Sequence, residues 1–220
     1  RIMSSSEADG SENFVLLSDV VPDIIQEIRY FSTFNFIGER VDGYEQPCAL
    51  ITKQAAEALK KANAEAIKQG YRLKVYDAYR PQRAVNHFVR WAKDLNATNM
   101  KPYFYPEVDK SVLFEQGYID YKSGHTRGST IDLTLFDTKT CQELDMGSYF
   151  DYFGSISHPS YTGNLTEQQL SNRKKLSSIM TNNGFKPLDT EWWHFTLLNE
   201  PFPNTYFDFP VSSNSVKHNV

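Results

Sequence analysis

The spacing of apolar residues along the chain predicts three helices. The clearest covers residues 52–70, where apolar side chains recur every three or four positions, as on the buried face of an amphipathic helix. Thr52 can cap its amino end and Gly70 can end it. A second helix is expected to have Pro81 at its first position. The inner faces of these two helices are predicted to consist of Ala55, Ala56, Leu59, Ala62 and Ala66, and of Ala84, Val85, Phe88, Ala92 and Leu95.

A third helix and three strands complete the predicted regular structure. The third helix begins with a capping box, Thr166-x-x-Gln169, and is expected to end at Gly184. Strands are indicated by alternating polar and apolar residues or by runs of aromatic and β-branched residues. The predicted strands are 72–79, 129–136 (STIDLTLF) and 191–198 (EWWHFTLL).

The order of these elements favours one fold class. Helices and strands are mixed without regular βαβ alternation, so we predict an α+β fold with a largely antiparallel sheet flanked by helices. A chain of 220 residues with 40% hydrophobic residues can bury a sizeable core and is short enough for a single domain. We place that domain at 14–211, between a flexible polar tail at 1–13 and a C-terminal tail at 212–220.

Charge and hydropathy limit the partners. A net charge of −4 and a sequence pI of about 5.8 leave no basic stripe for a phosphate backbone, so no nucleic-acid partner is expected. No stretch approaches the ~18 consecutive apolar residues of a membrane-spanning helix. A homo-oligomer is left open.

The compartment also stays open. Because the chain begins at Arg1, a signal peptide could have been removed, which would give an exported or periplasmic protein; otherwise the protein would be cytoplasmic. Cys48 and Cys141 fit either one long-range disulfide or two thiols.

The five histidines limit the candidate metal ligands. A structural role is expected for His87, which has no acidic or histidine partner one helical turn away, and a solvated position for His218 in the tail. His158 lies in a polar loop and is a reserve ligand. His125 and His194 remain, and each has a carboxylate close by in the sequence. Catalytic zinc sites use three such side chains and leave a fourth position for water.

Both histidines face the same geometric difficulty. His125 precedes Asp132 by seven residues, so a regular strand would send the two to opposite faces, and Gly128 would have to provide a bend. For His194, the neighbouring Glu191 would have to lie at the strand entrance or on a bulge. The alternative is structural: a turn histidine, a hydrogen-bonded aspartate and a solvated glutamate. The sequence contains neither an HExxH helix nor a GxSxG elbow.

Two other features point to a site. Arg80 falls at the corner between the strand 72–79 and the second helix, where it could also form a salt bridge that fixes the corner. The segment 96–122 is rich in Pro, Tyr, Asn and Gly and lacks periodicity. An irregular loop of that length usually has a function, and we expect this one to form part of the wall of a pocket.

Three separated segments resemble the LAS (M15) zinc metallopeptidases. SGHTRGSTID at 123–132 resembles their SxHxxGxAxD motif, and EWWH at 191–194 resembles their ExxH motif. Within that family the chain is most similar to the vancomycin-resistance D-Ala-D-Ala dipeptidases, over about residues 18–211. Thr130 and Gly124 depart from the pattern, where relatives have Ala and often Ser. The matching segments are DAYRPQRAV (77–85), SGHTRGSTIDLTL (123–135) and EWWHFTLLNEPFPNTYFDFP (191–210).

The resemblance implies a Hedgehog/DD-peptidase-like fold, one zinc ion per chain, and hydrolysis of the D-alanyl-D-alanine dipeptide. Alternatives are a D,D-carboxypeptidase acting on peptidoglycan stem peptides and a non-catalytic zinc domain, against which the presence of the acid/base candidate argues. Whether the reaction serves antibiotic resistance or D-Ala recycling stays open. The implied roles are zinc ligation by His125, Asp132 and His194, general-base catalysis by Glu191, transition-state stabilisation by Arg80, and substrate contact by Ser123 and, at the free amino end, by Asp151.

Overall fold

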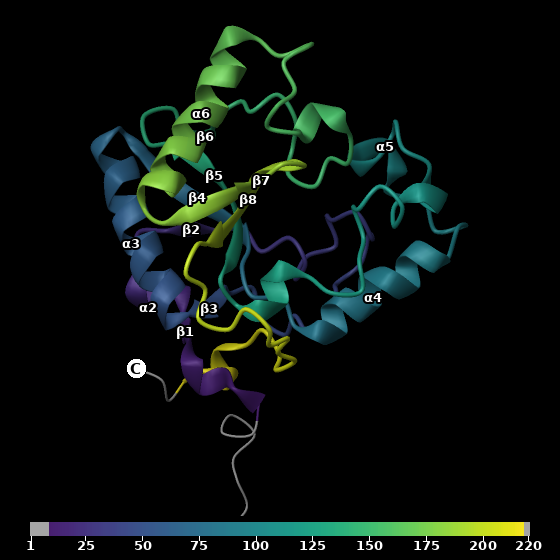
Figure 1. Ribbon diagram of the computed structural model, residues 1–220, viewed down its shortest axis with the longest axis horizontal. Helices are drawn as coiled ribbons and strands as arrows, with labels where there is room; N and C mark the ends of the chain where they lie inside the picture. Colours follow the sequence, from purple (N-terminus) through teal and green to yellow (C-terminus); the bar gives the residue numbers. More distant parts are fainter. Residues whose placement is uncertain (1–8, 218–220) are drawn as a thin grey trace, which may run out of the picture.

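The computed structural model describes residues 9–217 and shows an α+β fold around one mixed sheet (Figure 1). The strand order is β2-β4-β5-β8-β7, and β6 pairs with β5. Only the β2–β4 pair is parallel, so the prediction of a largely antiparallel sheet is confirmed. The strands are β2 (Ile25–Gln26), β4 (Tyr71–Asp77), β5 (Thr130–Asp137), β6 (Gln142–Glu143), β7 (Phe185–Leu188) and β8 (Glu191–Leu197).

Helices flank this sheet. The long helices α3 and α6 lie together on one side of it, and α4 lies on the other (Figure 1). A small antiparallel pair joins β1 (Phe14–Leu16) to β3 (Leu50–Thr52). The helices are α2 (Leu17–Val20), α3 (Lys53–Lys68), α4 (Gln82–Lys93), α5 (Lys101–Phe104) and α6 (Glu167–Asn182), with 3-10 turns η1 (Ser11–Asn13), η2 (Lys110–Val112), η3 (Gly124–Arg127), η4 (Ser155–Ser157) and η5 (Ser213–Ser215).

The first and third helices have the predicted ends. The Thr52 hydroxyl accepts a hydrogen bond from the Ala55 amide, and Gly70 follows the helix with a left-handed φ of 90°. The whole predicted apolar stripe of α3 is buried. In α6 the capping box between Thr166 and Gln169 is formed in both directions.

The second helix differs from the prediction at both ends. Pro81 has an extended backbone with ψ 154°, so it precedes the helix as its N-cap and is not the first helical residue. The helix ends at Lys93, and Leu95 is 57% exposed beyond it. Leu95 was therefore wrongly assigned to the inner face, because the apolar spacing continues for two residues after the backbone has left the helix.

The central strand β5 is buried on both faces. Ile131, Leu133 and Leu135 lie on the predicted apolar side, and the alternate residues, including Asp132, are buried too. The alternation of polar and apolar residues tells the two faces of the strand apart, but it does not determine whether either face is exposed to solvent. A polar row covered by other parts of the chain is where a binding site can form.

The packed part of the chain extends beyond 14–211 at both ends, because Ser11 and Val216 are buried. Residues 1–8 and 218–220 lie outside the described residues, and the tails stay predictions there. Cys48 and Cys141 are both free thiols in the structure. Within residues 9–217 none of the helices has the length and apolar character needed to cross a bilayer.

Candidate active site

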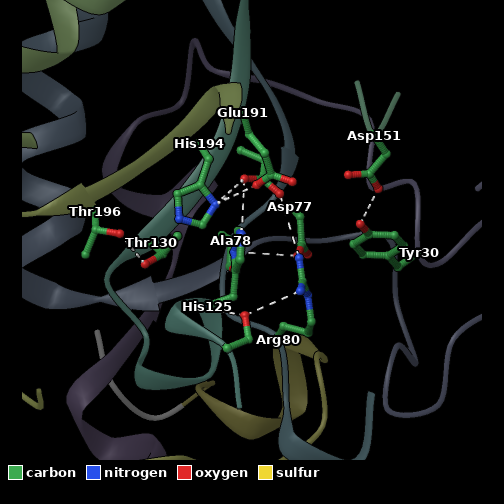
Figure 2. A network of polar contacts seen from close by, with 12 residues as sticks. Tyr30, Asp77, Ala78, Arg80, His125, Thr130, Asp151, Glu191, His194 and Thr196 are labelled. Carbon is green, nitrogen blue, oxygen red and sulfur yellow. Dashed lines mark hydrogen bonds and ion pairs between the residues drawn. The ribbon is translucent and has the colours of Figure 1, made fainter. Parts of the chain in front are cut away.

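One pocket is lined by all seven residues to which the family resemblance assigns a role. It opens over the polar face of β5 and β8, and the residues at its centre are drawn in Figure 2. The segment 96–122 contributes part of its wall through residues 117–120, which confirms that prediction. The predicted site residues in its lining are Arg80, Ser123, His125, Asp132, Asp151, Glu191 and His194.

His125 reaches Asp132 because it does not lie on the strand. It belongs to the 3-10 turn η3, and Gly128 then takes a left-handed φ of 95° before β5 begins. A Cβ at Gly128 would lie 2.3 Å from the Phe14 ring, so both the conformation and the space require glycine. This turn removes the parity difficulty and brings His125 Nε2 to 3.1 Å from Asp132 Oδ1.

A backbone carbonyl fixes the tautomer of His125. Its Nδ1 lies 2.8 Å from the carbonyl oxygen of Ala78, which can only accept, so Nδ1 carries the proton. In the neutral ring Nε2 is then a lone pair that faces a carboxylate oxygen. Two acceptors at this distance repel each other unless a proton or a metal ion lies between them. A backbone carbonyl that orients a histidine in this way is the usual support of a metal-binding imidazole.

His194 approaches from the neighbouring strand, directly opposite Asp132 in the β5–β8 pairing. Its Nδ1 is buried without a hydrogen bond of good geometry and lies 3.3 Å from both Asp132 Oδ1 and Glu191 Oε1. Glu191 is the first residue of β8, and the β7–β8 register shifts between Pro187 and Leu188. The sequence required a strand entrance or a bulge here. Glu191 lies at the strand entrance, beside this register shift, and lines the same pocket as His194.

The electrostatics of this group favour a cation. Burial alone would raise the pKa of Asp132, but His125 and His194 hold it well below its ordinary value. Burial alone would lower the pKa of His194, but Asp132 and Glu191 outweigh it and raise the pKa to about 9. In the metal-free protein a proton on His194 therefore partly offsets the two carboxylates.

The ligand atoms of His125, Asp132 and His194 all lie within 4.8 Å of one another. One buried carboxylate and two imidazoles, one with its lone pair turned toward the carboxylate, form a donor set that suits a divalent transition metal. The residues present therefore fit a metal ion, and Glu191 lies beside them.

Arg80 forms the corner salt bridge and also lines the pocket. Its Nε donates to Asp77 Oδ2 at 3.0 Å, and its Nη2 lies 3.0 Å from the same oxygen. The guanidinium also lies 3.7 Å from Asp132 Oδ2 and donates a long hydrogen bond, 3.4 Å, to Ser123 Oγ. Asp77 accepts a further hydrogen bond, 2.5 Å, from the Tyr44 hydroxyl. Arg80 can therefore both fix the corner through its salt bridge and serve the site, because the salt bridge holds its guanidinium at the pocket.

Asp151 lies apart from the three grouped donors His125, Asp132 and His194. It is buried, has a left-handed φ of 62°, and accepts a short hydrogen bond from the Tyr30 hydroxyl (Figure 2). Burial and the charges of Asp132 and Glu191 raise the pKa of Asp151 well above its ordinary value. A cationic group placed here would relieve that repulsion.

Sequence reasoning missed Tyr30 and gave Asp77 no role. Asp77 lies three residues before Arg80 in the motif DAYRP, and that proximity was the available signal. Tyr30 lies in an aromatic segment for which no element was predicted. Its partner Asp151 is 121 residues away, so no local pattern could reveal the contact.

Among the described residues, the reserve ligand His158 and the helical His87 are not part of this group. His87 Nε2 lies 2.7 Å from Glu39 Oε1, and its Nδ1 accepts from the Asp42 amide at 3.0 Å, in agreement with a structural role. The carbonyl oxygen of His158 accepts from Arg173. His218 lies outside the described residues.

The two departures from the motif lie next to each other. The hydroxyls of Thr130 and Thr196 form a 2.8 Å hydrogen bond across β5 and β8. A Cβ at Gly124 would lie 3.1 Å from Thr130 Oγ1, tighter than most such contacts. The smaller residue at 124 therefore makes room for the larger residue at 130.

Three grouped donors, an adjacent carboxylate and a guanidinium in one pocket define the site of a metal-dependent hydrolase. Comparison with known proteins agrees with this class. The profile of the D-ala-D-ala dipeptidase family, Peptidase_M15, matches residues 10–212. The chain therefore belongs to the M15 D-Ala-D-Ala dipeptidase family.

Several curated relatives match over most of their length. A D-alanyl-D-alanine dipeptidase of Enterococcus faecium is 42% identical over 90% of this chain and 98% of that relative. Another from Streptomyces coelicolor is 38% identical over 91% of this chain and 98% of that relative. A solved mutant of the vancomycin resistance D,D-pentapeptidase VanY, in complex with Zn(II), has a TM-score of 0.41 and 14% identity over 72% of this chain and 78% of that chain.

Proposed function

We propose that this chain is a zinc-dependent dipeptidase that hydrolyses D-alanyl-D-alanine to two molecules of D-Ala. The single observation that carries the proposal is that the ligand atoms of His125, Asp132 and His194 lie within 4.8 Å of one another, with Glu191 beside them. The names of the relatives, which match over nearly their whole length, supply the substrate.

Zinc suits the donor set. It accepts imidazole nitrogen and carboxylate oxygen together, and three protein ligands leave a fourth position for water. When bound, zinc lowers the pKa of a coordinated water to about 7. The hydrogen bond from His125 Nδ1 to Ala78 would keep the other nitrogen ready for the metal.

Glu191 and Arg80 would carry the reaction. The Glu191 carboxylate, with Oε1 3.3 Å from His194 Nδ1, is placed to accept the proton of the attacking water and to pass it to the departing amine. Arg80 would offer its permanently charged fork to the oxyanion that develops on the peptide carbonyl. Its salt bridge to Asp77 would keep the fork oriented before the substrate arrives.

Asp151 would select the free dipeptide. A substrate ammonium beside Asp151 would pair with a carboxylate that is otherwise buried and accepts only the Tyr30 hydroxyl among the contacts of the described residues. A blocked amine would leave that carboxylate without its cation. This argues against a carboxypeptidase acting on stem peptides, in which that amine is part of a peptide bond.

A substrate panel tests the proposal. Purified protein would be assayed on D-Ala-D-Ala, L-Ala-L-Ala, N-acetyl-D-Ala-D-Ala and a stem pentapeptide, with and without a chelator. We expect the free D,D-dipeptide to be cleaved fastest and the chelator to abolish cleavage. Faster release of D-Ala from the pentapeptide would replace the dipeptidase by the carboxypeptidase. Asp151→Asn should reduce the preference for a free amine over the acetylated substrate, whereas Asp145→Asn, outside this pocket, should leave it unchanged.

A further inference from the structure

A second polar row crosses the sheet beside the metal ligands. Asp132 and His194 are direct partners on β5 and β8, and two residues along the strands Thr130 and Thr196 are direct partners as well. On the other side of β8, Thr196 is the direct partner of Lys186 on β7. Directly opposite residues of an antiparallel sheet share a face, so Lys186 lies on the face that carries the metal ligands.

This row marks the end of the pocket opposite to Asp151. In Figure 2 the Thr130–Thr196 pair and Asp151 lie on opposite sides of His194 and Glu191. Thr196 and Lys186 line the same pocket as Asp151. The pocket thus has a carboxylate at one end and an ammonium at the other, which matches the two charged ends of a zwitterionic dipeptide.

Of the three cationic residues other than Arg80 that line this pocket, Lys186 is the one whose side chain has no charged or aromatic partner among residues 9–217. Arg127 donates to both carboxylate oxygens of Glu200, at 2.6 and 3.3 Å, so its charge is already paired. Lys122 places its Nζ 4.9 Å from the centre of the Tyr206 ring. Within residues 9–217, the side chain of Lys186 has no hydrogen bond, ion pair or ring contact, and the residue is exposed at the pocket wall.

The length of a dipeptide fits this arrangement. If the ammonium lies at Asp151 and the peptide carbonyl lies at the metal ligands, the C-terminal residue must extend past His194 toward Thr196. Two residues along a strand span about 6.6 Å, and the flexible four-carbon side chain of a lysine can cover the remaining distance to a carboxylate.

We propose that Lys186 binds the C-terminal carboxylate of the dipeptide substrate. This inference rests on the proposed function. It adds to the same site a second residue that recognises a charged end of the substrate. Lys186 would act in substrate binding and not in proton transfer, because it lies a row away from Glu191 and the metal ligands. A carboxylate contact that is equal in the ground state and in the transition state changes KM and leaves kcat unchanged.

The test compares a free and a blocked carboxylate. Steady-state kinetics of the zinc-loaded full chain would be measured on D-Ala-D-Ala and on its C-terminal amide, for the parent, Lys186→Met, Lys186→Arg and Lys61→Met. Lys61 is an exposed lysine of α3 outside the pocket and serves as the matched control. Thermal melts of all four proteins would report on folding.

Lys186→Met should raise KM for D-Ala-D-Ala about tenfold, the effect of one charge-assisted hydrogen bond, with kcat within about twofold of the parent. KM for the amide should stay unchanged, Lys186→Arg should restore most of the affinity, and Lys61→Met should have no effect. An unchanged KM for D-Ala-D-Ala, or an equal rise for acid and amide, would overturn the assignment of Lys186 and leave the proposed function standing. A parent protein that cleaves neither substrate would refute the proposed function and this inference with it.

Discussion

Asp77 and Arg80 are joined by two 3.0 Å contacts to one carboxylate oxygen, three residues apart at the corner between β4 and α4. Both side chains are nearly enclosed, with 1% and 11% of their side-chain surface exposed. The pair orients the Arg80 guanidinium, which also faces Asp132. The β4–α4 corner and the position of this cation in the site therefore depend on the same contact.

Asp77→Asn is expected to damage both stability and turnover. Removing one partner of a buried ion pair leaves the other charge uncompensated and costs about 3 kcal/mol of stability. The Arg80 guanidinium would also be held less firmly, which should lower kcat more than it raises KM. Chemical denaturation and steady-state kinetics measure the two effects. The control is Asp208→Asn, which removes an exposed pair with Arg83 and should cost less than about 1 kcal/mol. Equal effects of the two variants would contradict the role given to Asp77.

Glu191→Gln separates metal binding from proton transfer. Glu191 is not one of the three grouped ligands, so the variant should retain bound zinc while kcat falls about 10² to 10⁴-fold, the range for a general acid–base group. His194→Ala should instead lose the metal. Zinc content by elemental analysis, together with kcat, distinguishes the two, and a Glu191→Gln enzyme with parental turnover would remove the proposed mechanism.

Zinc affinity should depend on pH through His194. The pKa of this side chain in the metal-free protein is about 9 against an ordinary 6.5, because Asp132 and Glu191 outweigh its burial. The stabilisation from its proton is complete below about pH 6.5 and is lost as the pH rises through 9. Zinc must displace this proton, so its apparent affinity should rise about tenfold per pH unit from 7 to 9 and then level off.

Chelator competition at several pH values measures this slope. Buffers of different ionisation enthalpy in calorimetry would report the released proton directly. An affinity that does not change between pH 7 and 9 would mean that His194 is already unprotonated in the metal-free protein.

Gly124 and Thr130 are expected to be energetically coupled. A Cβ at 124 would lie 3.1 Å from Thr130 Oγ1, so Gly124→Ala should destabilise the protein by about 1 to 2 kcal/mol through overpacking. In a Thr130→Ala background, where that hydroxyl is absent, the same substitution should cost less. A double-mutant cycle by chemical denaturation gives the coupling; purely additive effects would show that the two departures from the motif are independent.

The sequence by itself determined the elements and the chemistry-bearing residues. The stripe and cap of α3, the capping box of α6 and the alternation in β5 are local signals, and each produced the element that it predicts because helix and strand periods are properties of a few consecutive residues. His125, Asp132, Glu191 and His194 were found from residue type and spacing, and the motifs of the family added Arg80, Ser123 and Asp151.

Only the tertiary structure decided how these residues meet. Gly128 turns η3 away from β5, the irregular start of β8 directs Glu191 and His194 to one side, and the pairing of β5 with β8 brings Asp132 opposite His194. The helix α4 also ends before Leu95, which the apolar spacing alone did not reveal. The way the site residues meet depends on contacts between residues far apart in the chain, and local periodicity carries no information about which distant segment will supply the partner.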